Sequence, residues 1–196
     1  MRVVAGIALG ICTYAGAAFA VTGDACDVAA HLVHADADLP RAAAAVSTAK
    51  ALTVVVAGTT SSTLPGTNGQ ALAYPARLEA ALQKRLPGVA VKIISMAKPR
   101  QTAADMAQAF PKVLKDEKPA LVIWQTGTAD AMQGVGPEAF QGILETTVDK
   151  LHDGGADVIF MNMQYSPRTD AVLSTAAYAD AIRWVALEHA VNVFDR

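Results

Sequence analysis

Hydrophobic residues along the chain gather in five short, continuous runs that are separated by longer stretches with a helical period. The runs cover residues 52–57, 89–94, 120–124, 158–161 and 191–194. Between them, apolar residues recur every three or four positions over 74–86, 103–114, 140–151 and 178–185, as expected for amphipathic helices. Strands that are apolar at every position are typical of a parallel sheet covered on both faces. The pattern therefore predicts a doubly wound α/β domain with a parallel five-stranded sheet.

The N-terminal region does not follow this pattern. Met1 and Arg2 precede an apolar stretch that ends near Ala15 and is too short to span a bilayer, and the small-x-small motif 18–20 follows it. We therefore expect a signal peptide over 1–20, a leader with a short helix over 21–51 and the α/β domain over 52–196. This organisation predicts a periplasmic or secreted protein with no stable membrane span after cleavage, and an uncleaved N-terminal anchor is the alternative.

Composition excludes several classes of function. The chain has 16 Lys and Arg residues against 18 Asp and Glu residues, a net charge of −2, so no nucleic-acid partner is expected. Cys26 is the one cysteine outside the signal peptide, and no Cys/His group has the spacing of metal ligands. We therefore expect neither a metal nor another cofactor.

Polar residues cluster directly after the predicted strands, in the segments "GTTSST", "SMAKPRQT", "QTGTAD" and "NMQYSPRTD". The carboxyl ends of parallel strands meet at one edge of the sheet, which is where α/β domains bind ligands. The side chains expected to gather there are Ser61, Arg100, Gln125, Asp130, Asn162, Gln164 and Arg168.

The loop after the first strand favours a nucleophile over a phosphate site. No lysine or arginine lies between Gly58 and Gly69, and both the P-loop and the dinucleotide fingerprint are absent. A serine just past a strand end lies where backbone N–H groups converge on a developing oxyanion. Thr60, Ser61 and Ser62 are the candidate hydroxyls.

Four segments, in this order and spacing, resemble the SGNH/GDSL hydrolases over roughly 52–196. They are "GTTSST" after the first strand, "YPARLEAAL" at the next helix, "LVIWQTGTADA" in the third conserved block of the family and "ADVIFMNMQYSPR" at the fourth strand. The resemblance implies a flavodoxin-like three-layer α/β/α sandwich and hydrolysis of acyl esters, among them acylated carbohydrates. It also implies a serine nucleophile, oxyanion donors from blocks I to III, and a late D-x-x-H that supplies the base.

Carried over by position, the resemblance makes Ser61 the nucleophile, with Thr60 and Ser62 as alternatives of register. Arg100 stands where block II has a glycine, and its guanidinium suits an anionic substrate. Block III has Gly127 followed by Ala129 in place of the family's asparagine, so Gln125 or Asn162 is expected to substitute as the oxyanion donor. Asp130 is expected to fix the block III loop.

The general base is missing from the sequence pattern. His152 and His189 each end a helix that precedes a strand, which places them at the amino edge, and His31 and His34 lie in the leader. The chain ends after its fifth strand without a D-x-x-H. We therefore expect a fragment, inactive as it stands, of a hydrolase whose D-x-x-H follows downstream. The alternative is a non-catalytic relative that binds a carbohydrate or similar envelope ligand at the same edge.

Overall fold

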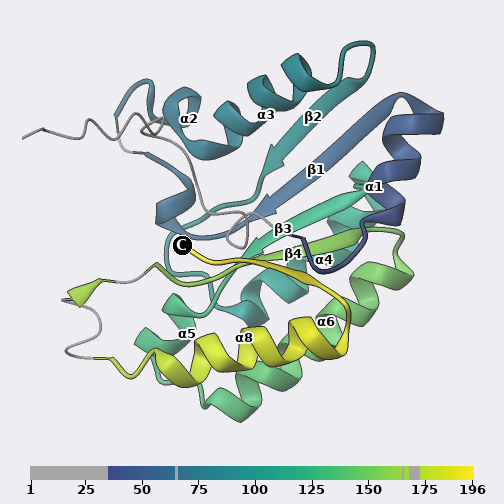
Figure 1. The fold of residues 1–196 in the computed structure, drawn as a ribbon. Coiled ribbons are helices and arrows are strands. Elements are labelled where there is room, and N and C mark those ends of the chain that lie inside the picture. The colour runs from purple at the N-terminus through teal and green to yellow at the C-terminus, as the bar shows by residue number, and fades with distance from the viewer. Residues whose placement is uncertain (1–34, 65, 165, 168–172) are drawn as a thin grey trace, which may run out of the picture.

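Five parallel strands form the centre of the computed structural model, in the order β2-β1-β3-β4-β5 (Figure 1). They are β1 (Ala51–Ala57), β2 (Ala90–Ser95), β3 (Leu121–Gln125), β4 (Asp157–Met161) and β5 (Asn192–Phe194). The structure describes residues 35–64, 66–164, 166–167 and 173–196. Each predicted strand is confirmed to within one residue at either end, and the order is that of flavodoxin-like sheets.

Helices cover both faces of the sheet, which confirms the predicted three-layer α/β/α sandwich (Figure 1). The described helical elements are α1 (Pro40–Ala44), the π turn η2 (Ala45–Ala49), the 3₁₀ turn η3 (Thr60–Ser62), α2 (Gly69–Leu72), α3 (Tyr74–Arg85), α4 (Ala103–Glu117), α5 (Thr128–Gln133), α6 (Pro137–Asp153) and α8 (Ala176–Glu188). One face of the sheet packs on α4, α6 and α8, and the other packs on α1 and α3.

Successive strand residues point to opposite layers, so the apolar runs fill both cores at once. On β3, for example, Val122 and Trp124 face the α4/α6/α8 layer, whereas Ile123 faces α1 and α3. Trp124 is fully buried, with its ring centroid 5.3 Å from that of Phe110 and 5.5 Å from that of Phe160. A strand that must bury both faces has no room for polar alternation, which explains the continuous runs.

The short helix expected in the leader forms and is tied to the amino edge of the sheet. The Arg41 guanidinium lies 3.2 Å from the buried Asp157 carboxylate, whose other oxygen accepts a hydrogen bond of 2.8 Å from the Ala42 N–H. Arg41 also donates to the His152 carbonyl at 3.0 Å. These contacts position α1 over β4 although more than 100 residues separate the partners in sequence.

The residues predicted to form a signal peptide, together with Cys26, His31, His34 and Arg168, lie outside the described residues. Among the helices that are described, none combines the length and apolarity needed to cross a membrane.

Candidate active site

The chain leaves β1 at Gly58 and turns sharply through η3, which presents its hydroxyls differently. The Ser62 N–H donates to the Thr59 carbonyl at 2.9 Å, and the Thr63 N–H donates to the Thr60 carbonyl at 3.1 Å. Thr60 and Ser61 are exposed, whereas Ser62 is only 1% exposed. The turn therefore directs one serine outward and the next into the protein.

Gln125, the last residue of β3, joins the two serines through its buried amide. Ser62 Oγ donates to Gln125 Oε1 at 2.5 Å, and Gln125 Nε2 donates to Ser61 Oγ at 2.6 Å. The contact follows from strand pairing, because Ala57 lies opposite Trp124 and so brings the next residues of both strands together. One N–H of the Gln125 amide is therefore directed at Ser61 Oγ.

Only glycine fits at position 58 without a rearrangement, because the Ser62 and Gln125 side chains lie close to its backbone. A Cβ on Gly58 would lie 2.5 Å from Ser62 Oγ and 3.0 Å from Gln125 Oε1. A glycine at the strand end thus lets the Ser62–Gln125 pair pack directly against the backbone.

A cleft of about 850 Å³ opens over the exposed side of η3 at the carboxyl edge. Its described walls come from the ends of β1 and β4, the loop after β2, α5 and the C-terminal segment. They are Thr59, Thr60, Ser61, Arg100, Thr128, Ala129, Met132, Gln133, Met163, Gln164, Ser166, Thr175 and Arg196. Of the residues expected from sequence, Thr60, Ser61, Arg100 and Gln164 line this cleft, and the described lining does not include Ser62, Gln125, Gly127, Asp130 or Asn162.

Arg100 has a backbone conformation that favours glycine. Its φ of 60° lies in the left-handed region that glycine adopts freely and arginine does not. The Gln133 side chain donates to the Arg100 carbonyl at 2.9 Å, which fixes the loop against α5. Within the described residues the N–H groups of Ser61 and Arg100 have no hydrogen-bond acceptor.

Asp130 binds backbone groups and lies below the cleft. Its fully buried carboxylate accepts from the Ala103 N–H at 2.9 Å, the Gly127 N–H at 3.3 Å and the Thr126 hydroxyl at 3.4 Å. Burial raises the pKa of the Asp130 carboxyl, and these hydrogen bonds offset part of the rise. The contacts join the β3–α5 loop to the start of α4, while the Ala129 methyl lines the cleft.

The C-terminus lies at the same edge of the sheet (Figure 1), where Asn162 binds the C-terminal residues. Its side-chain amide donates to Asp195 at 2.6 Å, its N–H donates to the Phe194 carbonyl at 3.0 Å, and its carbonyl accepts from Arg196 Nε at 3.0 Å. Arg196 is thereby placed in the cleft. Arg196 was not predicted from sequence, although it comes just after the fifth strand, as the predicted cleft residues follow the other strands.

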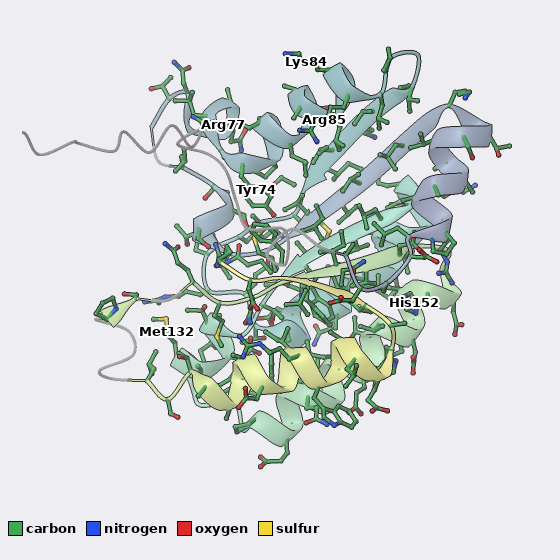
Figure 2. All side chains as sticks on the ribbon, viewed as in Figure 1. Tyr74, Arg77, Lys84, Arg85, Met132 and His152 are labelled. Carbon is green, nitrogen blue, oxygen red and sulfur yellow. The ribbon has the colours of Figure 1, made fainter. Side chains whose placement is uncertain are left out.

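Tyr74 is the first residue of α3 (Figure 2) and is not among the described residues that line the cleft. Burial raises the pKa of the Tyr74 phenol, and the nearby Ser62 and Arg196 side chains offset part of the rise. The buried hydroxyl has no partner of hydrogen-bonding geometry among the described residues.

Both described histidines lie at the opposite edge of the sheet, as expected from sequence. Figure 2 shows His152, at the end of α6, far from Met132 of the cleft. His152 and His189 line a separate groove of about 930 Å³ with Arg41 and Asp36, and His189 Nδ1 lies 2.9 Å from Asp149 Oδ1. Among described residues no group of three or more His, Cys, Asp and Glu side chains could hold a metal.

The chain is similar in sequence to lipase-like proteins and to an esterase. Residues 25–196 match the model of the Non-GDSL lipase-like family. Esterase TesA of Pseudomonas aeruginosa is 32% identical over 90 residues, which is 45% of this chain and 45% of that protein, so the chain matches less than half of the relative's length.

Solved structures of esterases share the fold. A crystal structure of TesA has a TM-score of 0.62 at 24% identity, covering 72% of this chain and 76% of that chain. AlinE4, an SGNH-hydrolase family esterase, has a TM-score of 0.62 at 21% identity, covering 73% of this chain and 75% of that chain.

Proposed function

The chain belongs to the Non-GDSL lipase-like family and is a member of the SGNH/GDSL hydrolases, and we propose that it is an exported serine hydrolase of acyl esters with Ser61 as its nucleophile. The observation that carries this proposal is the hydrogen bond of 2.6 Å from the buried Gln125 amide to the exposed Ser61 Oγ, at the floor of a cleft. Small acyl esters, acetyl esters and acylated carbohydrates are the substrate classes that we propose.

Ser61 is better suited to attack than its two neighbours. The Ser62 hydroxyl is buried and donates its proton to Gln125, so it is neither accessible nor free. Thr60 is exposed but carries a methyl group that crowds its hydroxyl and restricts χ1. Ser61 accepts from Gln125 and retains its own proton for transfer to a base.

In the proposed reaction, Ser61 Oγ attacks the ester carbonyl, loses its proton to a base and expels the alcohol, and water then releases the acyl group. The N–H groups of Ser61 and Arg100 are the proposed oxyanion donors, since both lie at the cleft and have no acceptor among described residues. The described walls contain no His, Asp or Glu, so the base must come from elsewhere. We accordingly expect the chain as printed to turn over slowly, if at all.

The second candidate is a non-catalytic relative that binds a carbohydrate or similar ligand at this edge. Ala129 favours it, because a methyl group lines the cleft where the family pattern has a donor amide. Loss of one oxyanion donor costs about 3 kcal/mol in the transition state.

Turnover and acylation of three variants test the proposal. Hydrolysis of p-nitrophenyl acetate and the intact mass of the acylated protein are measured for the chain and for Ser61→Ala, Ser62→Ala and Thr60→Ala. We expect acylation to be abolished by Ser61→Ala and to persist in Thr60→Ala, the exposed control. Acylation that persists in Ser61→Ala would exclude Ser61, and carbohydrate binding without any acylation would favour the second candidate.

Export is tested separately. We expect the protein produced in a Gram-negative host to be recovered from the periplasm with a mature N-terminus at Val21. Retention of residues 1–20 on the recovered protein would contradict the proposed signal peptide.

A further inference from the structure

The described side chains that line the cleft include two cations and no carboxylate. Arg100 and Arg196 both line it, and no described lining residue is acidic. The chain as a whole has a net charge of −2, so this local excess opposes the overall balance. A cleft with walls of one sign attracts ligands of the opposite sign.

Arg196 is held in place through Nε, and its two terminal guanidinium nitrogens have no hydrogen-bond partner among the described residues. Nε donates to the Asn162 carbonyl at 3.0 Å, while neither terminal nitrogen has a hydrogen bond or ion pair within the described residues. The side chain is open to solvent in the cleft, yet burial of part of the guanidinium lowers the pKa of Arg196. A partly desolvated, oriented fork of donors is suited to an oxyanion group.

The groups that could neutralise Arg196 are engaged or neutral. The adjacent Asp195 carboxylate accepts from the Asn162 amide at 2.6 Å and lies 3.3 Å from Arg183, and both Asp195 and Arg183 line the groove of His152 rather than the described cleft. Tyr74 lies near Arg196, but burial raises the pKa of its phenol and keeps it uncharged. Among the described residues, no acidic side chain therefore forms an ion pair with the Arg196 guanidinium.

The apolar residues that line the cleft indicate the chemistry of the uncharged part of the ligand. Met132, Met163 and Ala129 supply apolar surface beside Ser61, and the Met132 side chain is exposed at the rim of α5 (Figure 2). An apolar wall next to a cationic end fits a short acyl group joined to an anionic group.

We propose that Arg196 and Arg100 bind an anionic group, a carboxylate or a phosphate, on the ester that reaches Ser61. This inference rests on the proposed function for the identity of the reacting bond, but the anion site itself does not require turnover. We expect about a tenfold to hundredfold preference for an anionic over a neutral ligand of the same shape.

Binding to the Ser61→Ala protein tests the site without hydrolysis. The probes are monomethyl succinate against dimethyl succinate, and glycerol 3-phosphate against glycerol, with affinities measured by calorimetry. We expect the anion of at least one pair to bind tenfold more tightly than its neutral partner. Added to Ser61→Ala, Arg196→Gln and Arg100→Gln are each expected to remove most of that preference.

Lys98→Gln is the matched control, because Lys98 is an exposed cation of the same loop that does not line the described cleft. Equal affinities within both pairs, or an equal loss in Lys98→Gln, would overturn the proposal. Arg100→Gln keeps the test decisive if Arg196→Gln fails to fold. Anion preference without acylation of Ser61 would refute only the hydrolase proposal, and Ser61-dependent turnover without anion preference would refute only the anion site.

Discussion

Replacement of Gly58 by alanine is expected to disrupt the group that holds Ser61 while leaving the sheet intact. The new Cβ would lie 2.5 Å from Ser62 Oγ, about 1 Å closer than an ordinary contact, so the serine side chain must move. Its movement breaks the hydrogen bond to Gln125 and frees the amide that donates to Ser61. The substitution should therefore lower both stability and acylation of Ser61.

The structure sets the size of the effect. Overpacking a filled site costs about 1–3 kcal/mol, and loss of one buried hydrogen bond adds about 1 kcal/mol. Removing the hydroxyl that is in the way should relieve much of this cost, because the next contacts of the new Cβ, Gln125 Oε1 at 3.0 Å and Ser62 Cβ at 3.3 Å, are less severe. Gly58→Ala and Ser62→Ala should thus be coupled by about 1 kcal/mol or more in a double-mutant cycle.

Urea denaturation of the two single variants and the double variant measures this coupling. Gly142→Ala is the control, since a Cβ there meets nothing within 4 Å and should stabilise α6 by about 0.5–1 kcal/mol. If Gly58→Ala is as stable as the parent, or if the two changes are additive, the hydrogen-bonded group does not pack as described. If acylation of Ser61 is unchanged in Gly58→Ala, the hydrogen bond from Gln125 does not contribute to the reactivity of Ser61.

Three further substitutions test individual features. Arg100→Gly should raise the free energy of unfolding by about 1 kcal/mol because it relieves the left-handed φ of 60°, whereas Arg100→Gln should not; chemical denaturation distinguishes them. Asp105→Ala should cost about 1 kcal/mol at pH 7, since it removes the carboxylate half of the capping box, which accepts from the Thr102 N–H and hydroxyl at 2.9 Å each. The hydrogen bonds from Thr102 lower the pKa of Asp105, so the stability that its carboxylate contributes is present above pH 4 and is lost as the pH falls. Unfolding curves should therefore show that the variant loses less stability below pH 4 than the parent does. Burial, and next the charge of Arg41, lower the pKa of His152, so the fold favours the neutral ring, and stability is lost as the pH falls below 6.5. His152→Gln should reduce the dependence of the melting temperature on pH between pH 6.5 and pH 5. An unchanged dependence would contradict this.

The central strands β1, β3 and β4 could be predicted from sequence because burial on both faces leaves no polar alternation along them, whereas the edge strand β2 was predicted from its β-branched residues although it is exposed or half-buried throughout. The long helices α4, α6 and α8 were equally clear, since each buries an apolar stripe, and α3 was recognised from Leu78 and Leu82, which are half-buried. The short helices α2 and α5 were missed, because four or six residues carry no helical period. Their positions depend on packing, as with Gly69, whose added Cβ would meet the Leu64 carbonyl at 1.8 Å.

The edge of the sheet that bears the site was predictable, but the arrangement within it was not. The rule that ligands bind at the carboxyl edge selected Ser61 and Arg100, and both line the cleft. The rule could not show that Ser61 is exposed and Ser62 is buried, because this depends on η3, which rotates successive side chains by a third of a turn. Sequence reasoning also had no access to the pairing of Ala57 with Trp124, which brings Gln125 to the serines.

Two buried amides at neighbouring strand ends hold the two sides of the cleft, one with Ser61 and the other with Arg196. Gln125 ends β3 and donates to Ser61, while Asn162 follows β4 and holds the segment that carries Arg196. The strands are paired so that Gln125 lies opposite Met161, the residue before Asn162. Each amide is almost fully buried and uses its polar atoms on protein partners, so each orients another group and neither lines the described cleft. A fixed spacing between Ser61 and Arg196 therefore follows from the register of β3 and β4, and a ligand that reaches both must match it.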